Sequence, residues 1–296
     1  KIFIAEKTYG KSTVLRTPMN KITLTSSCHG YILEQIGALD NIAVFCDAEY
    51  IIYDKVKERI ISGNIANAGN GLNPSAEIIL SKGSDAIWVS SFENSSQSSI
   101  SNLPIPIIYC ADYMEASPLG RAEWMRFFGL LVNQKEKADS LFCLIEKNYK
   151  EIVDSIDLYK NGNRPKTLLA ELHYQSTWYV PGGESTMGIL YKDAGYKYQW
   201  AEDENSGSIA LSPEAVLAKA GNSDVWIFKY YADHKYTKDE FIGLDKYFGQ
   251  FDAVKNGEIY GCNTMLTDFY DVTPFRPDIL LEEIKNLGNN YFHKIE

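Results

Sequence analysis

A long segment without proline constrains the fold of this chain more than any other feature. No proline lies between Pro118 and Pro165. Within that segment, apolar residues follow the three- and four-residue spacing of one helix face: Leu141, Phe142, Ile145, Tyr149, Ile152, Val153 and Ile156. A helix from Gln134 to about Tyr159 would extend for about 38 Å at ~1.5 Å per residue. This length predicts a single helix that could connect two lobes.

Signals for helix ends lie on both sides of this segment. Ser117 before Pro118 predicts a helix start, with serine as the N-cap and proline at the first helical position. Asn133 followed by Glu136 predicts a second cap with its reciprocal partner, and this cap would open the long helix. The glycine and proline of the segment 161–165 predict the break that follows it.

Short apolar runs alternate with helical patterns outside this region. Strands are expected at Ile22–Thr25, Ile42–Phe45, Ala86–Val89, Ile105–Tyr109 and Thr167–Leu172, and helices around Tyr31–Ile36 and Ala76–Leu80. Such alternation is typical of a parallel sheet with helices on its faces. We therefore expect an α/β fold of two lobes, each with a central, mainly parallel sheet flanked by helices, joined by one long interlobe helix.

The length of 296 residues allows two modest cores. The expected boundaries are residues 1–117 for the N-terminal lobe, 118–160 for the helical segment with the interlobe helix, and 161–296 for the C-terminal lobe.

The two halves also contain similar segments. Glu77–Lys82 is followed by a Ser-Asp pair and an apolar strand. Glu214–Lys219 is followed by the same elements, but its Ser-Asp pair lies two positions farther along the chain. Glu77 and Glu214 would each lie in the first turn of a helix, where the helix dipole favours a carboxylate. One acidic residue on each lobe would also suit docking onto paired arginines of a partner.

Charge and hydropathy exclude several partners. With 39 acidic and 29 basic residues, the net charge is -10, which would repel a nucleic-acid backbone. No uninterrupted apolar run approaches the ~20 residues that a membrane-spanning helix needs. We therefore expect neither nucleic acid nor a membrane span.

No motif for metal, redox or nucleotide chemistry is visible. The five cysteines contain no CxxC pair and are interpreted as buried thiols: Cys28, Cys46, Cys110, Cys143 and Cys262. The four histidines are scattered, which disfavours a purpose-built zinc hydrolase: His29, His173, His234 and His293. No P-loop, dinucleotide fingerprint or GxSxG elbow is present. Ser26 or Ser27 near His29 is interpreted as a helix cap in preference to a nucleophile beside its base.

Aromatic residues gather at predicted strand ends. The chain has 20 tyrosines and 5 tryptophans, and those near strand ends include Tyr174, Trp178, Tyr179, Tyr230, Tyr231, Phe269 and Tyr270. Ligands of open α/β sheets bind outside the carboxyl ends of the strands. Rings at that position can hold a large flat ligand, although about half of them could simply pack the lobes.

Four segments in the right order resemble the periplasmic binding proteins of siderophore, haem and cobalamin importers, especially those of Bacteroides-type bacteria. These segments are Asn73–Asp85, Asp112–Trp124, Pro181–Leu190 and Phe275–Leu281. The resemblance implies a monomeric, non-enzymatic receptor in the periplasm. It would have lost a lipoprotein leader, with a lipid anchor as its only membrane contact. It implies an ABC permease and its ATPase as partners, and permease docking through the positions of Glu77 and Glu214.

The resemblance also implies a ligand between the lobes, with no other cofactor. The loops that precede the docking glutamates carry aromatic rings in cobalamin binders, but Gly63–Asn70 and Asn205–Ser208 carry none here. We therefore expect haem, a ferric chelate or a different corrinoid. The candidate ligand-binding residues are Tyr50, Asn67, Phe92, Asp112, Arg121, His173, Tyr174, Trp178, Tyr179, Tyr230, Tyr231, Asp268 and Phe269.

Several alternatives stay open. Arg121 could meet the ligand or pair with Glu115 or Glu123, and His173 could ligate iron or be a satisfied histidine beside a strand end. A first rival function is an enzyme on a similar scaffold, which would need a phosphate-gripping loop or clustered cysteines. A second is a zinc or manganese receptor, which would need three His or carboxylate ligands that converge. The identity of the metal is left open.

Overall fold

A computed structural model describes residues 15–90, 99–156 and 164–296. The chain divides into two compact units, and each unit is assembled from separate pieces of sequence. The first unit comprises residues 1–114, 123–143 and 270–275, and the second comprises 115–122, 144–269 and 276–296. The helix α5 (Lys135–Asp154) therefore contributes residues to both units.

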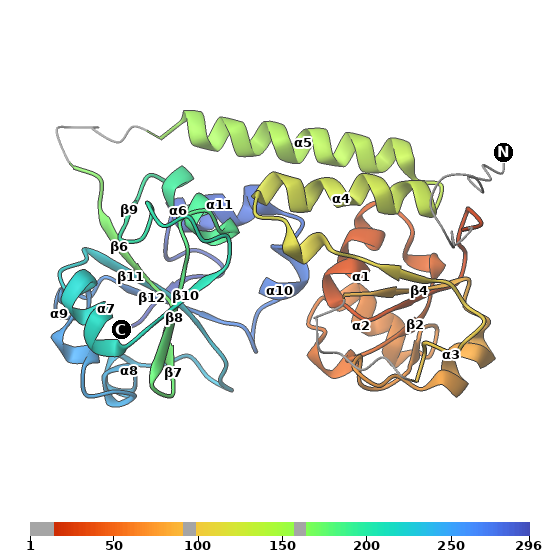
Figure 1. The fold of residues 1–296 in the computed structure, drawn as a ribbon, viewed down its shortest axis with the longest axis horizontal. Coiled ribbons are helices and arrows are strands. Elements are labelled where there is room, and N and C mark those ends of the chain that lie inside the picture. The colour runs from red at the N-terminus through yellow and green to blue at the C-terminus, as the bar shows by residue number, and fades with distance from the viewer. Residues whose placement is uncertain (1–14, 91–98, 157–163) are drawn as a thin grey trace. The chain divides into compact units, whose positions relative to one another are not determined.

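The first unit contains a five-stranded parallel sheet in the order β3-β2-β1-β4-β5. Its strands are β1 (Ile22–Leu24), β2 (Ile42–Phe45), β3 (Ala66–Asn67), β4 (Ala86–Val89) and β5 (Ile107–Tyr109). Its helices are α1 (Ser27–Gln35), α2 (Asp54–Ile61) and α3 (Ala76–Lys82), with 3-10 turns at Leu39–Asn41, Ala48–Tyr50 and Asp112–Met114. Figure 1 shows these helices around the strands. The predicted parallel sheet is confirmed.

The second unit contains two sheets. The larger has the order β13-β12-β11-β6-β9, in which only the β12/β13 pair is antiparallel within the described sheet. Its strands are β6 (Thr167–Ala170), β9 (Lys197–Tyr198), β11 (Val225–Tyr230), β12 (Ile259–Asn263) and β13 (His293–Lys294). The smaller, antiparallel sheet consists of β7 (His173–Tyr174), β8 (Thr177–Pro181) and β10 (Ser208–Leu211). The sequence pattern does not predict these three strands, and their aromatic residues indicate only a ligand surface.

Short helices complete the second unit and the connections. They are α6 (Thr186–Asp193), α7 (Pro213–Ala220), α8 (Lys238–Gly243), α9 (Asp252–Lys255), α10 (Phe269–Val272) and α11 (Pro277–Lys285), with a 3-10 turn at Phe248–Gln250. The helix α4 (Pro118–Leu131) begins at the predicted proline.

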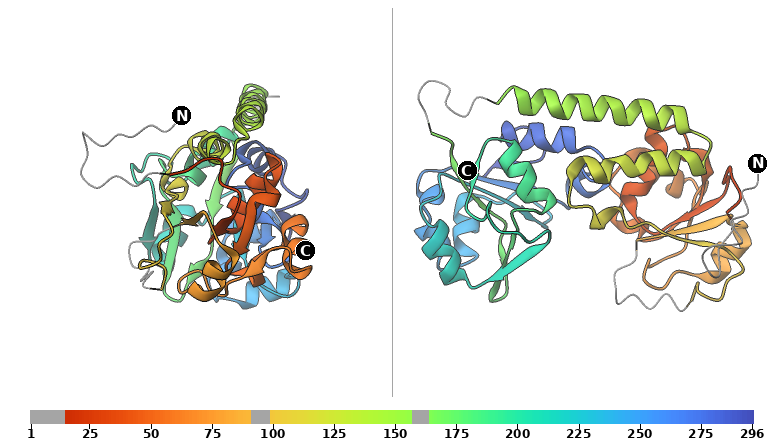
Figure 2. Two further views of the ribbon diagram at one scale, coloured as in Figure 1. Left: turned by 90° about the vertical axis from the view of Figure 1, so that its right-hand side faces the viewer. Right: turned by 45° about the horizontal axis from the view of Figure 1, so that its top comes forward.

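Two predictions about α5 are wrong in detail. Asn133 has a φ of 58°, the left-handed conformation of a residue that ends a helix, so it terminates α4 and does not cap α5. The long helix runs for 20 residues and ends at Asp154, short of the predicted Tyr159. At ~1.5 Å per residue its length is about 30 Å. Figure 2 draws it as one unbroken helix.

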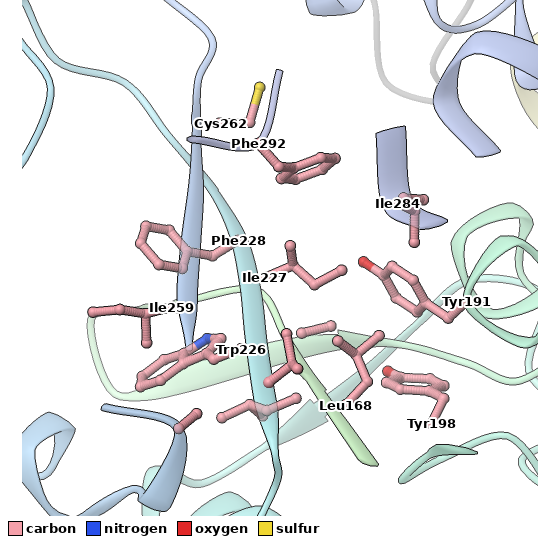
Figure 3. Close-up of a cluster of buried hydrophobic side chains, with 14 of the residues drawn as sticks. Leu168, Tyr191, Tyr198, Trp226, Ile227, Phe228, Ile259, Cys262, Ile284 and Phe292 are labelled. Carbon is pink, nitrogen blue, oxygen red and sulfur yellow. The ribbon is translucent and has the colours of Figure 1, made fainter. Parts of the chain in front are cut away.

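Aromatic side chains form much of the core of the second unit. Trp226, Ile227 and Phe228 of β11 are buried, and Figure 3 shows them with Leu168, Tyr191 and Tyr198. Four of the five cysteines are buried, as predicted. Cys143 is exposed, and its interpretation as a buried thiol is wrong because it lies outside the buried stripe of α5.

The helices α3 and α7 have the same kind of N-cap. The hydroxyl of Ser75 accepts a hydrogen bond from the backbone N–H of Ile78, and the hydroxyl of Ser212 accepts one from that of Ala215. The similarity of these segments, which the sequence indicated, therefore extends to their local structure. It places Glu77 and Glu214 in the first turns of equivalent helices.

Candidate functional site

A pocket of about 450 Å³ opens within the second unit. It lies at the carboxyl end of β6, where ligands of open α/β sheets bind. Its walls come from the segment after β6, from β8 and β11, from the start of α6, and from the start of β10 with the loop before it. The lining residues are Glu171, Leu172, Tyr179, Pro181, Ser185, Thr186, Met187, Ser206, Gly207, Ser208 and Lys229.

An ion pair lies in the wall of this pocket. The ammonium group of Lys229 contacts the Oε1 atom of Glu171, and both side chains are less than one-fifth exposed. Such partial burial strengthens the attraction between the two charges. The pocket therefore offers a cation and an anion that are pre-positioned by the two central strands.

The backbone at Glu171 is held in an unusual conformation. Its φ of 64° is left-handed, which is uncommon for a residue with a side chain. The N–H of Glu171 donates to the carbonyl of Ile227 over 2.9 Å, and its carbonyl accepts from the indole Nε1 of Trp226 over 2.9 Å. These bonds fix the direction of the carboxylate toward Lys229.

The opposite wall is the start of α6. The hydroxyl of Ser185 caps this helix by accepting from the N–H of Gly188, and Thr186 donates to the carbonyls of Glu115 and Ala116. Gly183 leaves no room for a side chain, because a Cβ atom would lie 2.3 Å from the carbonyl oxygen of Ala201. The helix α6 begins directly after this Gly-Gly segment, with Ser185 as its N-cap.

Tyr179 is the predicted ligand residue that lines this pocket. It is 50% exposed, whereas its neighbour Trp178 is 0% exposed. The indole Nε1 of Trp178 donates to the carbonyl of Ala170, and its ring packs against Trp226. Consecutive residues of a strand face opposite sides of the sheet, so Trp178 packs in the core whereas Tyr179 faces outward.

Three further predicted contacts are buried in the structure. Tyr230 is stacked on Tyr236 with ring centroids 4.4 Å apart. Phe269 is enclosed by the rings of Tyr291 and Phe292. Asp112 is buried in the first unit, where its Oδ1 atom lies 2.9 Å from Nε2 of His29. Each side chain already has a partner within its unit and offers no surface to a ligand.

His173 has the surroundings of a satisfied histidine. Its Nδ1 atom is 2.8 Å from the carbonyl oxygen of Gln175, and its ring packs against Trp178 and Phe248. Its Nε2 atom lies 3.2 Å from a carboxylate oxygen of Asp245, close enough for an ion pair but not aligned as a hydrogen bond. The structural interpretation of His173 therefore accounts for its environment.

Of the other predicted residues, those within the described part of the chain do not line the pocket. Tyr50, Tyr174 and Tyr231 are more than 60% exposed, and Asn67 uses its Oδ1 atom in a turn to Gly69. Asp268 accepts from the hydroxyl of Tyr291. Arg121 is half-buried at the start of α4, and Phe92 lies outside the described residues.

Sequence reasoning missed Glu171 and Lys229. A signal for Lys229 exists, because it is a lone charged residue in the strand Val225–Tyr230, whose other residues are all apolar or aromatic. A buried charge is costly unless it has a partner, so such a lysine indicates a nearby acidic residue. The sequence does not indicate which one, since Glu171 is 58 positions away.

Glu77 and Glu214 are both exposed in the first turns of their helices. The carboxylate of Glu214 accepts from the hydroxyl of Tyr247 over 2.8 Å. Its own backbone N–H, followed by Tyr247 and Ser212, holds the pKa of Glu214 below its ordinary value. Glu214 is therefore a charged group at neutral pH.

Comparison with known proteins explains this architecture. The sequence model of the periplasmic binding protein family matches residues 22–265. The chain belongs to the periplasmic binding protein family. In the branch that serves importers of iron siderophores, haem and vitamin B12, the members are substrate-binding proteins of ABC transporters and not enzymes. They bind metal chelates and work with an ABC permease and its ATPase.

Solved structures share the fold at low sequence identity. A possible iron-binding periplasmic protein from Staphylococcus epidermidis has a TM-score of 0.70 at 18% identity, with 91% of this chain and 98% of that chain covered. The haem-binding protein HutB of Vibrio cholerae has a TM-score of 0.67 at 12% identity, covering 91% and 99%. The vitamin B12-binding protein BtuF of Vibrio cholerae has a TM-score of 0.60 at 14% identity, covering 90% and 96%.

A relative in sequence is an uncharacterized lipoprotein of Methanocaldococcus jannaschii. It is 24% identical over 298 aligned positions, which cover 95% of this chain and 68% of that protein. Among the helices of the described segments, none is long and apolar enough to span a membrane.

Proposed function

We propose that this protein is the extracytoplasmic ligand-binding component of an ABC importer, which captures a metal chelate and delivers it to the permease. The chelate would be a ferric siderophore, haem or a corrinoid. The observation that carries this proposal is the pocket of the second unit, which is lined by Tyr179 and by a largely buried ammonium and carboxylate. Family membership supplies the class of cargo.

The lining of the pocket suits a flat or apolar ligand that carries a carboxylate at its edge. The exposed ring of Tyr179 can lie against an apolar face, and the hydroxyls of Ser185 and Ser208 can meet polar groups. The ammonium of Lys229 can meet a carboxylate of the ligand. Ser206 and Gly207 of the loop before β10 and Ser208 at the start of β10 line the same pocket without a ring, so the usual cobalamin clamp is not expected.

Replacement of Tyr179 by alanine should weaken ligand binding about tenfold or more, since loss of an aromatic contact of ~1.4 kcal/mol has that effect. Quenching of tryptophan fluorescence can measure affinity for haemin, cobinamide and ferric desferrioxamine in turn. The matched control is Tyr174→Ala, because Tyr174 is 72% exposed and lies outside the pocket lining. Its affinity should stay within about twofold of the original. Equal losses in both variants would place the ligand elsewhere.

We further propose a monomer in the periplasm that is held at the membrane by a lipid anchor. The support is the family and the lipoprotein name of the Methanocaldococcus relative. Expression of the complete gene in its host with radiolabelled palmitate should yield a labelled membrane fraction. Protein released by detergent should elute with the mass of a monomer. Unlabelled protein that is free in the periplasmic extract would contradict the anchor.

A further inference from the structure

A second cluster of chemically active side chains lies in the first unit. Cys28 and His29 are in the first turn of α1, and Asp112 begins the 3-10 turn after β5. One ligand atom of each residue lies within 4.8 Å of the other two. All three side chains are buried. The cluster is separate from the pocket, whose lining residues all belong to the second unit.

The imidazole of His29 is only partly satisfied. Its Nε2 atom lies 2.9 Å from Oδ1 of Asp112, whereas its buried Nδ1 atom has no hydrogen-bond partner. The rings of Trp88, Phe128 and Phe275 surround it, so water does not solvate this nitrogen. A buried polar atom without a partner costs roughly 1–3 kcal/mol. The nitrogen that can share an ion with Asp112 is Nε2, because the two ring nitrogens point in different directions.

The donor set matches one class of ion. Thiolate, imidazole and carboxylate together are ligands of Zn²⁺, whose bonds to sulfur, nitrogen and oxygen are about 2.3, 2.0 and 2.0 Å long. Such bond lengths place the ligand atoms of a tetrahedral site roughly 3.3–3.7 Å apart. Donor atoms that already lie within 4.8 Å of one another need only small side-chain movements to reach that geometry.

We propose that Cys28, His29 and Asp112 bind a single zinc ion inside the first unit. The ion takes one ligand atom from each residue, and Cys28 binds as the thiolate after it loses its proton to solvent. It connects the start of α1 to a segment more than 80 positions later in the chain, and a fourth ligand from outside these three residues completes its tetrahedral shell. This ion is separate from the chelated metal of the cargo, and its test does not depend on the proposed cargo.

Titration of the ligand-free protein with Co²⁺, a spectroscopic substitute for zinc, tests the site. About one equivalent should produce a thiolate-to-metal charge-transfer band, which Zn²⁺ then displaces. Cys28→Ser should abolish the band. Asp112→Asn should weaken the affinity at least about tenfold. The matched control is Cys46→Ser, since Cys46 is another buried thiol of the first unit and burial, with Asp47, raises its pKa to about 12. This control should keep the band.

The absence of a charge-transfer band from the original protein, or its retention in Cys28→Ser, would overturn the site. If Cys28→Ser fails to fold, zinc K-edge absorption of the original protein decides the question. One sulfur scatterer with nitrogen or oxygen neighbours supports the proposal, and a shell without sulfur refutes it.

Discussion

Uptake of the cargo should fall about a hundredfold or more when Glu77 and Glu214 are both replaced by lysine. If these carboxylates dock onto arginines of the permease, the substitutions oppose like charges, which costs several kcal/mol. Each ~1.4 kcal/mol lowers an affinity tenfold. Both side chains are exposed and neither belongs to the pocket lining, so ligand affinity should stay within about twofold. Uptake into cells and fluorescence titration of the purified variant measure the two effects.

A charge-matched variant separates docking from general electrostatics. Glu58 of α2 and Asp239 of α8 are also exposed and lie in helices of the first and second unit. Their double replacement by lysine changes the net charge from -10 by +4 to -6, as the docking variant does. Cells that express this control variant should take up the cargo at the normal rate. Equal uptake in both variants, whether normal or reduced, would refute docking through Glu77 and Glu214.

Replacement of Trp178 by alanine should lower the free energy of unfolding by about 3–5 kcal/mol, the usual cost of deleting a buried tryptophan. The ring is 0% exposed and packs against Trp226, Phe248 and Phe251. The variant also removes the indole hydrogen bond to Ala170. Urea denaturation followed by circular dichroism measures the change.

The adjacent residue supplies the comparison. Tyr179→Ala should change the free energy of unfolding by less than about 0.5 kcal/mol, because the ring is half-exposed. The two variants therefore have opposite signatures: loss of stability at Trp178 and loss of ligand affinity at Tyr179. A Trp178→Ala variant that is stable but binds weakly would restore Trp178 as a ligand contact.

The fold could be predicted because its signals are local. The apolar runs at Ile42–Phe45 and Ala86–Val89 match the strands β2 and β4, and Pro118 marks the start of α4. Buried parallel strands need such runs, and helices need caps, so neighbouring residues determine both. Asn133 shows the limit, since one residue type can end a helix or begin the next.

The site was predicted less well because it depends on contacts between distant residues. The sequence indicates the ring-rich segment after β6 as a candidate ligand surface, but the strand alternation within Thr177–Pro181 separates Trp178 from Tyr179. Because side chains alternate between the two faces of a strand, this alternation assigns Trp178 to the core and Tyr179 to the surface. The pairs Lys229–Glu171 and His29–Asp112 join residues 58 and 83 positions apart, which no local pattern indicates.

The central claim is that the protein binds an organic metal chelate. Native mass spectrometry and absorbance of protein purified from its own host, and of the same protein after incubation with haemin, cobinamide and ferric desferrioxamine, test this claim most directly. We expect a one-to-one complex whose added mass and visible absorption bands belong to a haem, corrinoid or ferric chelate. A tightly bound nucleotide, or no chelate under any of these conditions, would contradict it.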